Sequence, residues 1–111
     1  MLSMQSASES FFDQSLSTVR SIVLHHVSQD FSVFLFGSSA SGNRSHSSDI
    51  DIGFLGQTAL PQNTLRCIRE EIEESYVPFG VDLVDFFNKP DSFKTIALQT
   101  IQLWQSAPKK F

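Results

Sequence analysis

Two aspartates one residue apart are the part of this sequence best suited to chemistry. Asp49 and Asp51 stand in the segment Asp-Ile-Asp-Ile-Gly-Phe, whose alternation of polar and apolar residues is typical of a β-strand. Residues two apart in a strand point to the same face, so the two carboxylates project together. Neighbouring carboxylates raise each other's pKa unless a cation lies between them, and such oxygen ligands suit Mg²⁺ or Mn²⁺. Taken alone, the pair predicts either a metal site or an ordinary solvated strand face.

A loop of small residues, 37–48, leads into this pair. It begins with Gly37 and Ser38, directly after the apolar segment 31–36. The one arginine within the loop is Arg44. Glycine lets backbone N–H groups approach an anion, and a turn of helix at this point would add its positive end and the Ser38 hydroxyl. The loop therefore predicts either a phosphate cradle or a plain connection. Arg44 in turn is either a phosphate contact or a solvated side chain.

A third carboxylate lies in a second strand-like segment, residues 81–87, which reads Val-Asp-Leu-Val-Asp-Phe-Phe. By strand parity Asp82 shares a face with Val84 and Phe86, while Asp85 points to the opposite face. An aspartate among bulky apolar side chains is costly unless it is paired or ligating, which makes Asp82 a third candidate ligand. Asp85 is interpreted as either a solvated carboxylate or a hydrogen-bonding partner.

Hydrophobic periodicity predicts the elements that position these residues. Apolar residues recur three and four apart in three segments, and these are predicted to be helices; the last begins at Asp91 or Ser92 and carries an apolar stripe to Trp104. The predicted order is helix, strand, loop, strand, helix, strand and helix, over residues 10–27, 31–36, 37–48, 49–55, 61–76, 81–87 and 91–104. This pattern indicates an α/β (α+β) fold with a small mixed three-stranded sheet flanked by helices. Residues 1–9 are expected to form a disordered N-terminus, 10–105 the domain and 106–111 a tail.

Composition limits the classes of protein to consider. The length of 111 residues suits one domain, and a net charge of −4 does not favour sequence-independent nucleic-acid binding, which requires many basic residues. Cys67 is the single cysteine, so a reducing compartment is the simpler expectation. Neither a secretory leader nor an apolar run of membrane-spanning length is recognised. We expect a cytoplasmic protein that does not enter a membrane.

The loop and the strand together resemble a known motif. The pattern G-S-x-[AV]-[RK]-G-x-x-x-x-x-S-D-x-D reads GSSASGNRSHSSDID here, beginning at Gly37 and ending at Asp51. With the separate Asp82, it resembles the minimal nucleotidyltransferase (MNT) group of the DNA polymerase β superfamily, over nearly the whole chain. At the motif position usually occupied by Arg or Lys, this sequence has Ser41, which weakens the expected contact with a nucleoside triphosphate.

The resemblance implies a polymerase β-like fold and a transfer of a nucleoside monophosphate by two metal ions. Asp49 and Asp51 would hold two Mg²⁺ ions, or Mn²⁺, and Asp82 would complete the ion that activates the acceptor hydroxyl. The nucleotide, expected to be ATP, would be bound by four residues of the loop: Gly37, Ser38, Arg44 and Ser48.

The resemblance also implies a partner. MNT proteins typically work with a separately encoded, all-helical protein of the HEPN or substrate-binding type, some as the antitoxin of a toxin–antitoxin pair. We therefore expect a hetero-oligomer in which AMP passes to a hydroxyl on the partner or on a molecule that it holds. The alternative is a non-catalytic binding module that keeps the fold and neutralises its partner by stoichiometric contact. Transfer to RNA ends is disfavoured by the acidic charge and by the lack of room for an RNA-binding domain.

Overall fold

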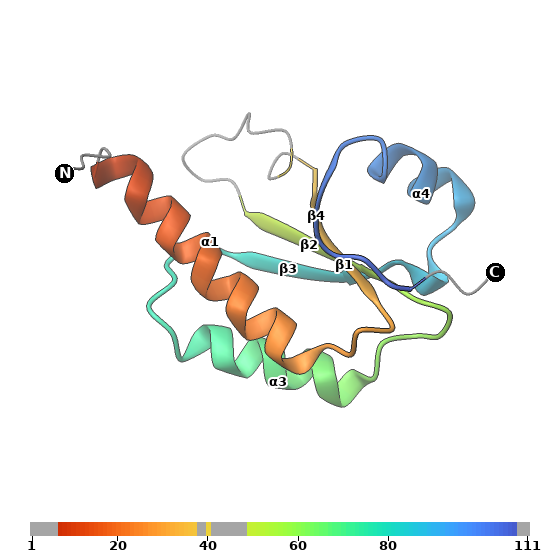
Figure 1. The fold of residues 1–111 in the computed structure, drawn as a ribbon, viewed down its shortest axis with the longest axis horizontal. Helices are drawn as coiled ribbons and strands as arrows, with labels where there is room; N and C mark the ends of the chain where they lie inside the picture. The colour runs from red at the N-terminus through yellow and green to blue at the C-terminus, as the bar shows by residue number, and fades with distance from the viewer. Residues whose placement is uncertain (1–6, 38–39, 41–48, 109–111) are drawn as a thin grey trace.

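The computed structural model describes residues 7–37, 40 and 49–108 (Figure 1). Its elements in chain order are α1 Ala7–His26, β1 Ser32–Phe36, β2 Ile50–Leu55, α3 Gln62–Glu73, β3 Val81–Asp85, the 3₁₀ turn η1 Phe86–Asn88, α4 Asp91–Ala97 and β4 Ile101–Gln105. Helix α1 begins three residues before the predicted start at residue 10. The α/β prediction is thus confirmed, and the predicted helices and strands are present up to α4.

The sheet has four strands in the order β3-β2-β1-β4. Strand β1 pairs antiparallel with both β2 and β4, whereas β2 and β3 are parallel. The sheet is therefore mixed, as predicted, but the expectation of three strands was wrong. Because β2 runs opposite to β1, the beginnings of β2 and β3 and the end of β1 lie at one end of the sheet.

Helices α1 and α3 cover one face of the sheet (Figure 1). Val19 and Val23 of α1 and Ile68 of α3 are fully buried there against Ile50 and Ile52 of β2. The two helices are also joined by the His26 imidazole, whose Nε2 lies 2.7 Å from a Glu71 carboxylate oxygen. Within the described residues, no helix is both long and apolar enough to cross a membrane.

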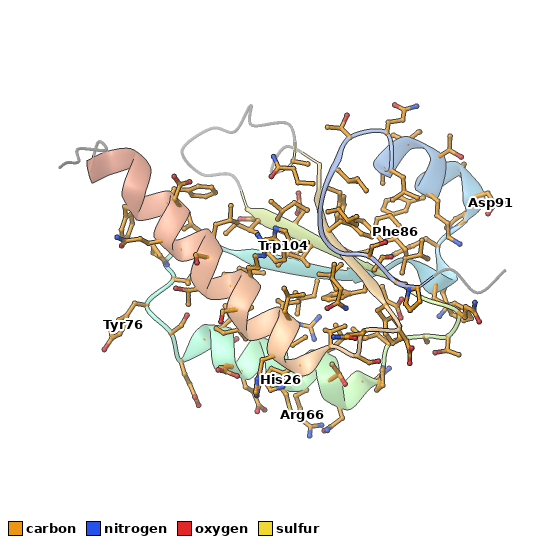
Figure 2. All side chains as sticks on the ribbon, in the orientation of Figure 1. His26, Arg66, Tyr76, Phe86, Asp91 and Trp104 are labelled. Atoms are coloured by element: carbon orange, nitrogen blue, oxygen red, sulfur yellow. The ribbon has the colours of Figure 1, made fainter. Side chains whose placement is uncertain are left out.

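The opposite face carries a second, aromatic core. Phe34 and Phe36 of β1 pack edge-on against Phe86, with ring centroids 5.1 and 5.2 Å apart, and Phe93 of α4 lies 5.3 Å from Phe86. Figure 2 places Phe86 between the sheet and α4. The predicted strand 81–87 ends at Asp85 because η1 begins there and turns Phe86 into this core.

The last predicted helix, 91–104, was wrong in its second half. Helix α4 ends at Ala97, and the chain turns back and forms β4 along β1. Without β4, the backbone groups on that edge of β1, a buried strand, would have no partner, which is costly. Gln105 strengthens the pairing, since its Nε2 donates to the backbone carbonyls of Ser28 and Phe31 at 3.0 and 2.8 Å.

Candidate active site

The three predicted aspartates are brought to one end of the sheet. Asp49 directly precedes β2 and Asp51 is its second residue. Asp82 is the second residue of β3, and the parallel register sets it directly beside Asp51. The neighbouring Ile50 amide donates to the Gly80 carbonyl at 2.8 Å, which fixes the alignment of the two strands. The fold thus confirms that the aspartates of both segments share one face and one end of the sheet.

Asp51 is in an environment that disfavours its charge. Partial burial raises the pKa of its carboxyl, and the negative charges of Asp82 and Asp49 and a side-chain hydrogen bond with Asp82 raise that pKa further. These neighbouring carboxylates repel one another, and a bound cation would reduce that repulsion.

Asp82 differs from its predicted surroundings. Its side chain is exposed, rather than enclosed by bulky apolar neighbours, because it lies near the start of the edge strand β3. The burial cost that singled out Asp82 in the sequence instead applies to Asp51. An exposed carboxylate beside a half-buried one leaves Asp82 accessible to a group that arrives from solvent.

Asp85 takes the second of the two roles left open for it. Its carboxylate accepts hydrogen bonds from the amides of Leu60, at 2.8 Å, and Phe87, at 3.0 Å. It therefore caps η1 and anchors the loop before α3. Asp85 is structural and stands apart from the carboxylate group at the other end of β3.

Gly37 forms one wall of the carboxylate group. It adopts the left-handed backbone conformation, φ 66°, and its carbonyl accepts from the Ala40 amide at 3.1 Å, so the chain turns sharply after β1. A Cβ at Gly37 would stand 2.9 Å from Asp51 Oδ2. The position therefore requires glycine for its backbone conformation and for the space beside Asp51.

Gly80 forms a second wall, which the sequence reasoning missed. A Cβ there would stand 2.7 Å from Asp49 Oδ1. The available signal was a glycine directly before the strand that carries Asp82. Two glycines thus allow backbone to approach two of the three carboxylates.

The remaining nucleotide-binding candidates, Ser38, Arg44 and Ser48, lie outside the described residues, as does Ser41. Their roles stay predictions.

The donor set fits a hard divalent cation, although it is not a preformed cage. All three side chains offer carboxylate oxygens, the ligands that Mg²⁺ and Mn²⁺ take. The raised pKa of Asp51 reflects partial burial first and then the negative charges of Asp82 and Asp49, whose repulsion a cation would offset. Within residues 7–37, 40 and 49–108, no three His, Cys, Asp or Glu side chains already stand close enough to hold a metal ion. A site here would need a small closure of the carboxylates or further oxygens from a bound phosphate.

Comparison with known proteins shows what the whole chain is similar to. The chain is 27% identical over 96 residues to the Probable protein adenylyltransferase MntA of Haemophilus influenzae, a match that covers 86% of this chain and 83% of that protein. Among solved structures, a toxin–antitoxin with AMP-PNP superposes with a TM-score of 0.64 at 20% identity, over 81% of this chain and 73% of that one.

A third match has the same fold. It is one chain of the structure of a tri-AMPylated Shewanella oneidensis HEPN toxin in complex with MNT antitoxin, with a TM-score of 0.60 at 18% identity, over 85% of this chain and 72% of that one. The family model "Polymerase beta, Nucleotidyltransferase" matches residues 22–107, which include β1, β2, β3 and all three aspartates. The chain belongs to the polymerase beta nucleotidyltransferase family.

Proposed function

We propose that this chain is the adenylyltransferase subunit of a toxin–antitoxin pair, which transfers AMP from ATP to a hydroxyl on a helical HEPN-type partner. The observation that carries the proposal is the group formed by Asp49, Asp51 and Asp82 beside the left-handed Gly37. Family membership supports the reaction class, and the relatives named MntA and MNT antitoxin support the nature of the acceptor.

The reaction forms a bond between the acceptor oxygen and the α-phosphorus of ATP, and the bond from that phosphorus to the β-phosphate oxygen breaks as pyrophosphate leaves. Gly37 lets the backbone come close to the phosphates. Asp49 and Asp51 would hold Mg²⁺, and the exposed Asp82 beside them would receive the proton of the acceptor hydroxyl. Bound Mg²⁺ would neutralise phosphate charge and lower the pKa of that hydroxyl.

The test is transfer of label from ATP to the co-encoded partner in the presence of Mg²⁺. We expect the wild-type chain to label the partner and Asp51→Asn to reduce the labelling rate by at least about a hundredfold, since ionic stabilisation in the transition state is lost. Asp13→Asn is the matched control, because Asp13 is an exposed carboxylate on α1, which covers the face of the sheet opposite to Asp51. Equal protection or binding of the partner by wild type and Asp51→Asn, with no label on the partner, would instead support the non-catalytic binding module.

A further inference from the structure

A groove of about 240 Å³ lies along the edge strand β3, between that strand and the second half of α3. We call it the β3 groove. In the part of the chain that the structure describes, no strand pairs with the outer side of β3, so the groove is open along this edge. Its volume is below the range of about 300–1,000 Å³ typical of small-molecule sites, so it suits a side chain of another protein better than a free ligand. The apolar residues that line it are Ile72, Val77, Phe79, Val81 and Leu83.

Exposed aromatic side chains continue this apolar surface beyond the groove. Phe79, which lines the groove, packs against Phe12 and Phe11 of α1, with ring centroids 5.0 and 6.1 Å apart. Phe11 is 53% exposed and Tyr76 is 99% exposed. Figure 2 shows Tyr76 projecting outward from the turn between α3 and β3. Large aromatic residues at a surface are enriched in protein–protein interfaces, where a few such side chains provide most of the binding energy.

The β3 groove and the carboxylate group lie on two faces of the same sheet edge. Asp82 stands between Val81 and Leu83 on β3, and by strand parity its side chain is on the opposite face. Gly80 also lines the groove, and a Cβ at this residue would stand 2.7 Å from Asp49 Oδ1. A protein that brings a hydroxyl to Asp82 therefore comes against the edge of β3 and has the groove as an adjoining apolar surface.

The charges around the groove indicate the kind of protein that fits. Glu73 lines the groove, Glu74 follows it in the chain, and Asp82 is exposed on the neighbouring strand. Arg69 is the one basic residue among the described residues that line it. A second copy of this chain would bring the same excess of negative charge and would be repelled. Resting on the proposed function, we propose that the β3 groove docks the segment of the helical partner that carries the acceptor hydroxyl, with an apolar side chain in the groove and basic side chains against the acidic rim.

The test measures the dissociation constant of the full chain and its co-encoded partner without ATP, and the steady-state rate of AMP transfer with Mg²⁺ and ATP. The variants are Tyr76→Ser and Glu73→Lys, which change exposed side chains, so a folding defect does not obscure the result. We expect each to weaken the complex by about tenfold, as for a contributing interface residue. The loss in Glu73→Lys should shrink as salt concentration rises, because it is electrostatic. In both variants the KM for the partner should rise while kcat is unchanged, since only binding is lost.

The matched controls are Phe87→Ser and Asp30→Lys. Phe87 is a 40% exposed aromatic residue beyond the far end of β3, and Asp30 is an exposed carboxylate before β1, at the end of the sheet away from the three aspartates. The proposal is overturned if either variant binds the partner as tightly as wild type, if the controls weaken binding equally, or if kcat falls while the affinity for the partner is unchanged. Self-association of the chain alone that Tyr76→Ser abolishes, measured by sedimentation equilibrium, would place a second copy on this surface and would also overturn it.

These results separate the groove from the proposed function. A wild-type chain that labels its partner, together with variants that bind the partner normally, overturns the groove proposal alone. A wild-type chain that neither binds nor labels the partner overturns the proposed function and the groove proposal with it.

Discussion

At the scale of single residues, Asp51 couples the site to the stability of the fold. A carboxyl whose pKa is higher in the folded than in the unfolded chain holds its proton more tightly when folded. The free energy of unfolding therefore falls as pH rises from the ordinary value of 3.8 through the raised pKa, and the full cost is present above it. At neutral pH without divalent cations, Asp51 thus destabilises the protein.

From this we expect Asp51→Asn to unfold at a higher temperature than wild type at neutral pH in the presence of a chelator. The difference should disappear below pH 3.8, where Asp51 is protonated in both states. Added Mg²⁺ should raise the melting temperature of the wild type, because it binds the folded state, and should raise that of Asp51→Asn less. A variant that is less stable than wild type at neutral pH, measured by thermal unfolding against the Asp13→Asn control, would contradict the proposed electrostatics.

Gly37 and Gly80 separate two reasons for glycine in the site. A Cβ added at either glycine would lie within 3 Å of a carboxylate oxygen, but only Gly37 has a positive φ. Gly37→Ala should lower the free energy of unfolding in urea by about 1–2 kcal/mol, because a left-handed conformation is unfavourable for alanine. Gly80→Ala should cost less, since the neighbouring Asp49 carboxylate is exposed and can move. Equal losses for the two variants would show that crowding, rather than backbone conformation, fixes Gly37.

The sequence predicted which aspartates lie together better than it predicted their surroundings. Asp49, Asp51 and Asp82 follow from strand parity and motif spacing, which are local properties. Which carboxylate is desolvated depends on the position of each strand in the sheet, and parity alone does not provide it. Asp51 lies in the interior strand β2, whereas Asp82 lies in the edge strand β3.

At the scale of elements, β4 shows the limit of hydrophobic periodicity. Residues 93, 96, 97, 100, 101 and 104 recur at helical spacing, but the stripe continues across a reversal of the chain after Ala97. The need for β4 arises from the unpaired edge of β1, a long-range requirement that no local window contains. The first three strands are each a short apolar or alternating run. This pattern is local, so these strands were predicted within one or two residues.

The Gln105 side chain offers a test of how β4 is held. Its Nε2 satisfies two backbone carbonyls in the turn before β1. Gln105→Ala should therefore lower the free energy of unfolding by about 1–2 kcal/mol, since two hydrogen bonds are lost. Gln29→Ala is the control, because Gln29 is exposed in the nearby turn after α1. A loss in urea unfolding no greater than that of Gln29→Ala would show that the pairing of β4 is independent of this side chain.

At the scale of the whole molecule, the sheet separates a core under α1 and α3 from an aromatic core under α4. Phe86 is fully buried in the second core, while the adjacent Phe87 is 40% exposed. Phe86→Ala should lower the free energy of unfolding by about 3–5 kcal/mol, and Phe87→Ala should change it by no more than about 0.5 kcal/mol. Similar values for the two variants in urea unfolding would contradict a second core that stabilises the fold.

The central claim is that the site formed by the three aspartates catalyses transfer of AMP from ATP to a protein hydroxyl. The most direct test is which phosphate of ATP is found on the partner. The chain and its co-encoded partner are incubated with Mg²⁺ and ATP labelled at either the α-phosphate or the γ-phosphate, and the partner is then isolated. Transfer of AMP predicts label on the partner from the α-position only, at a rate that Asp51→Asn lowers by at least about a hundredfold. Label from the γ-position, or a labelling rate that Asp51→Asn leaves unchanged, would contradict the claim.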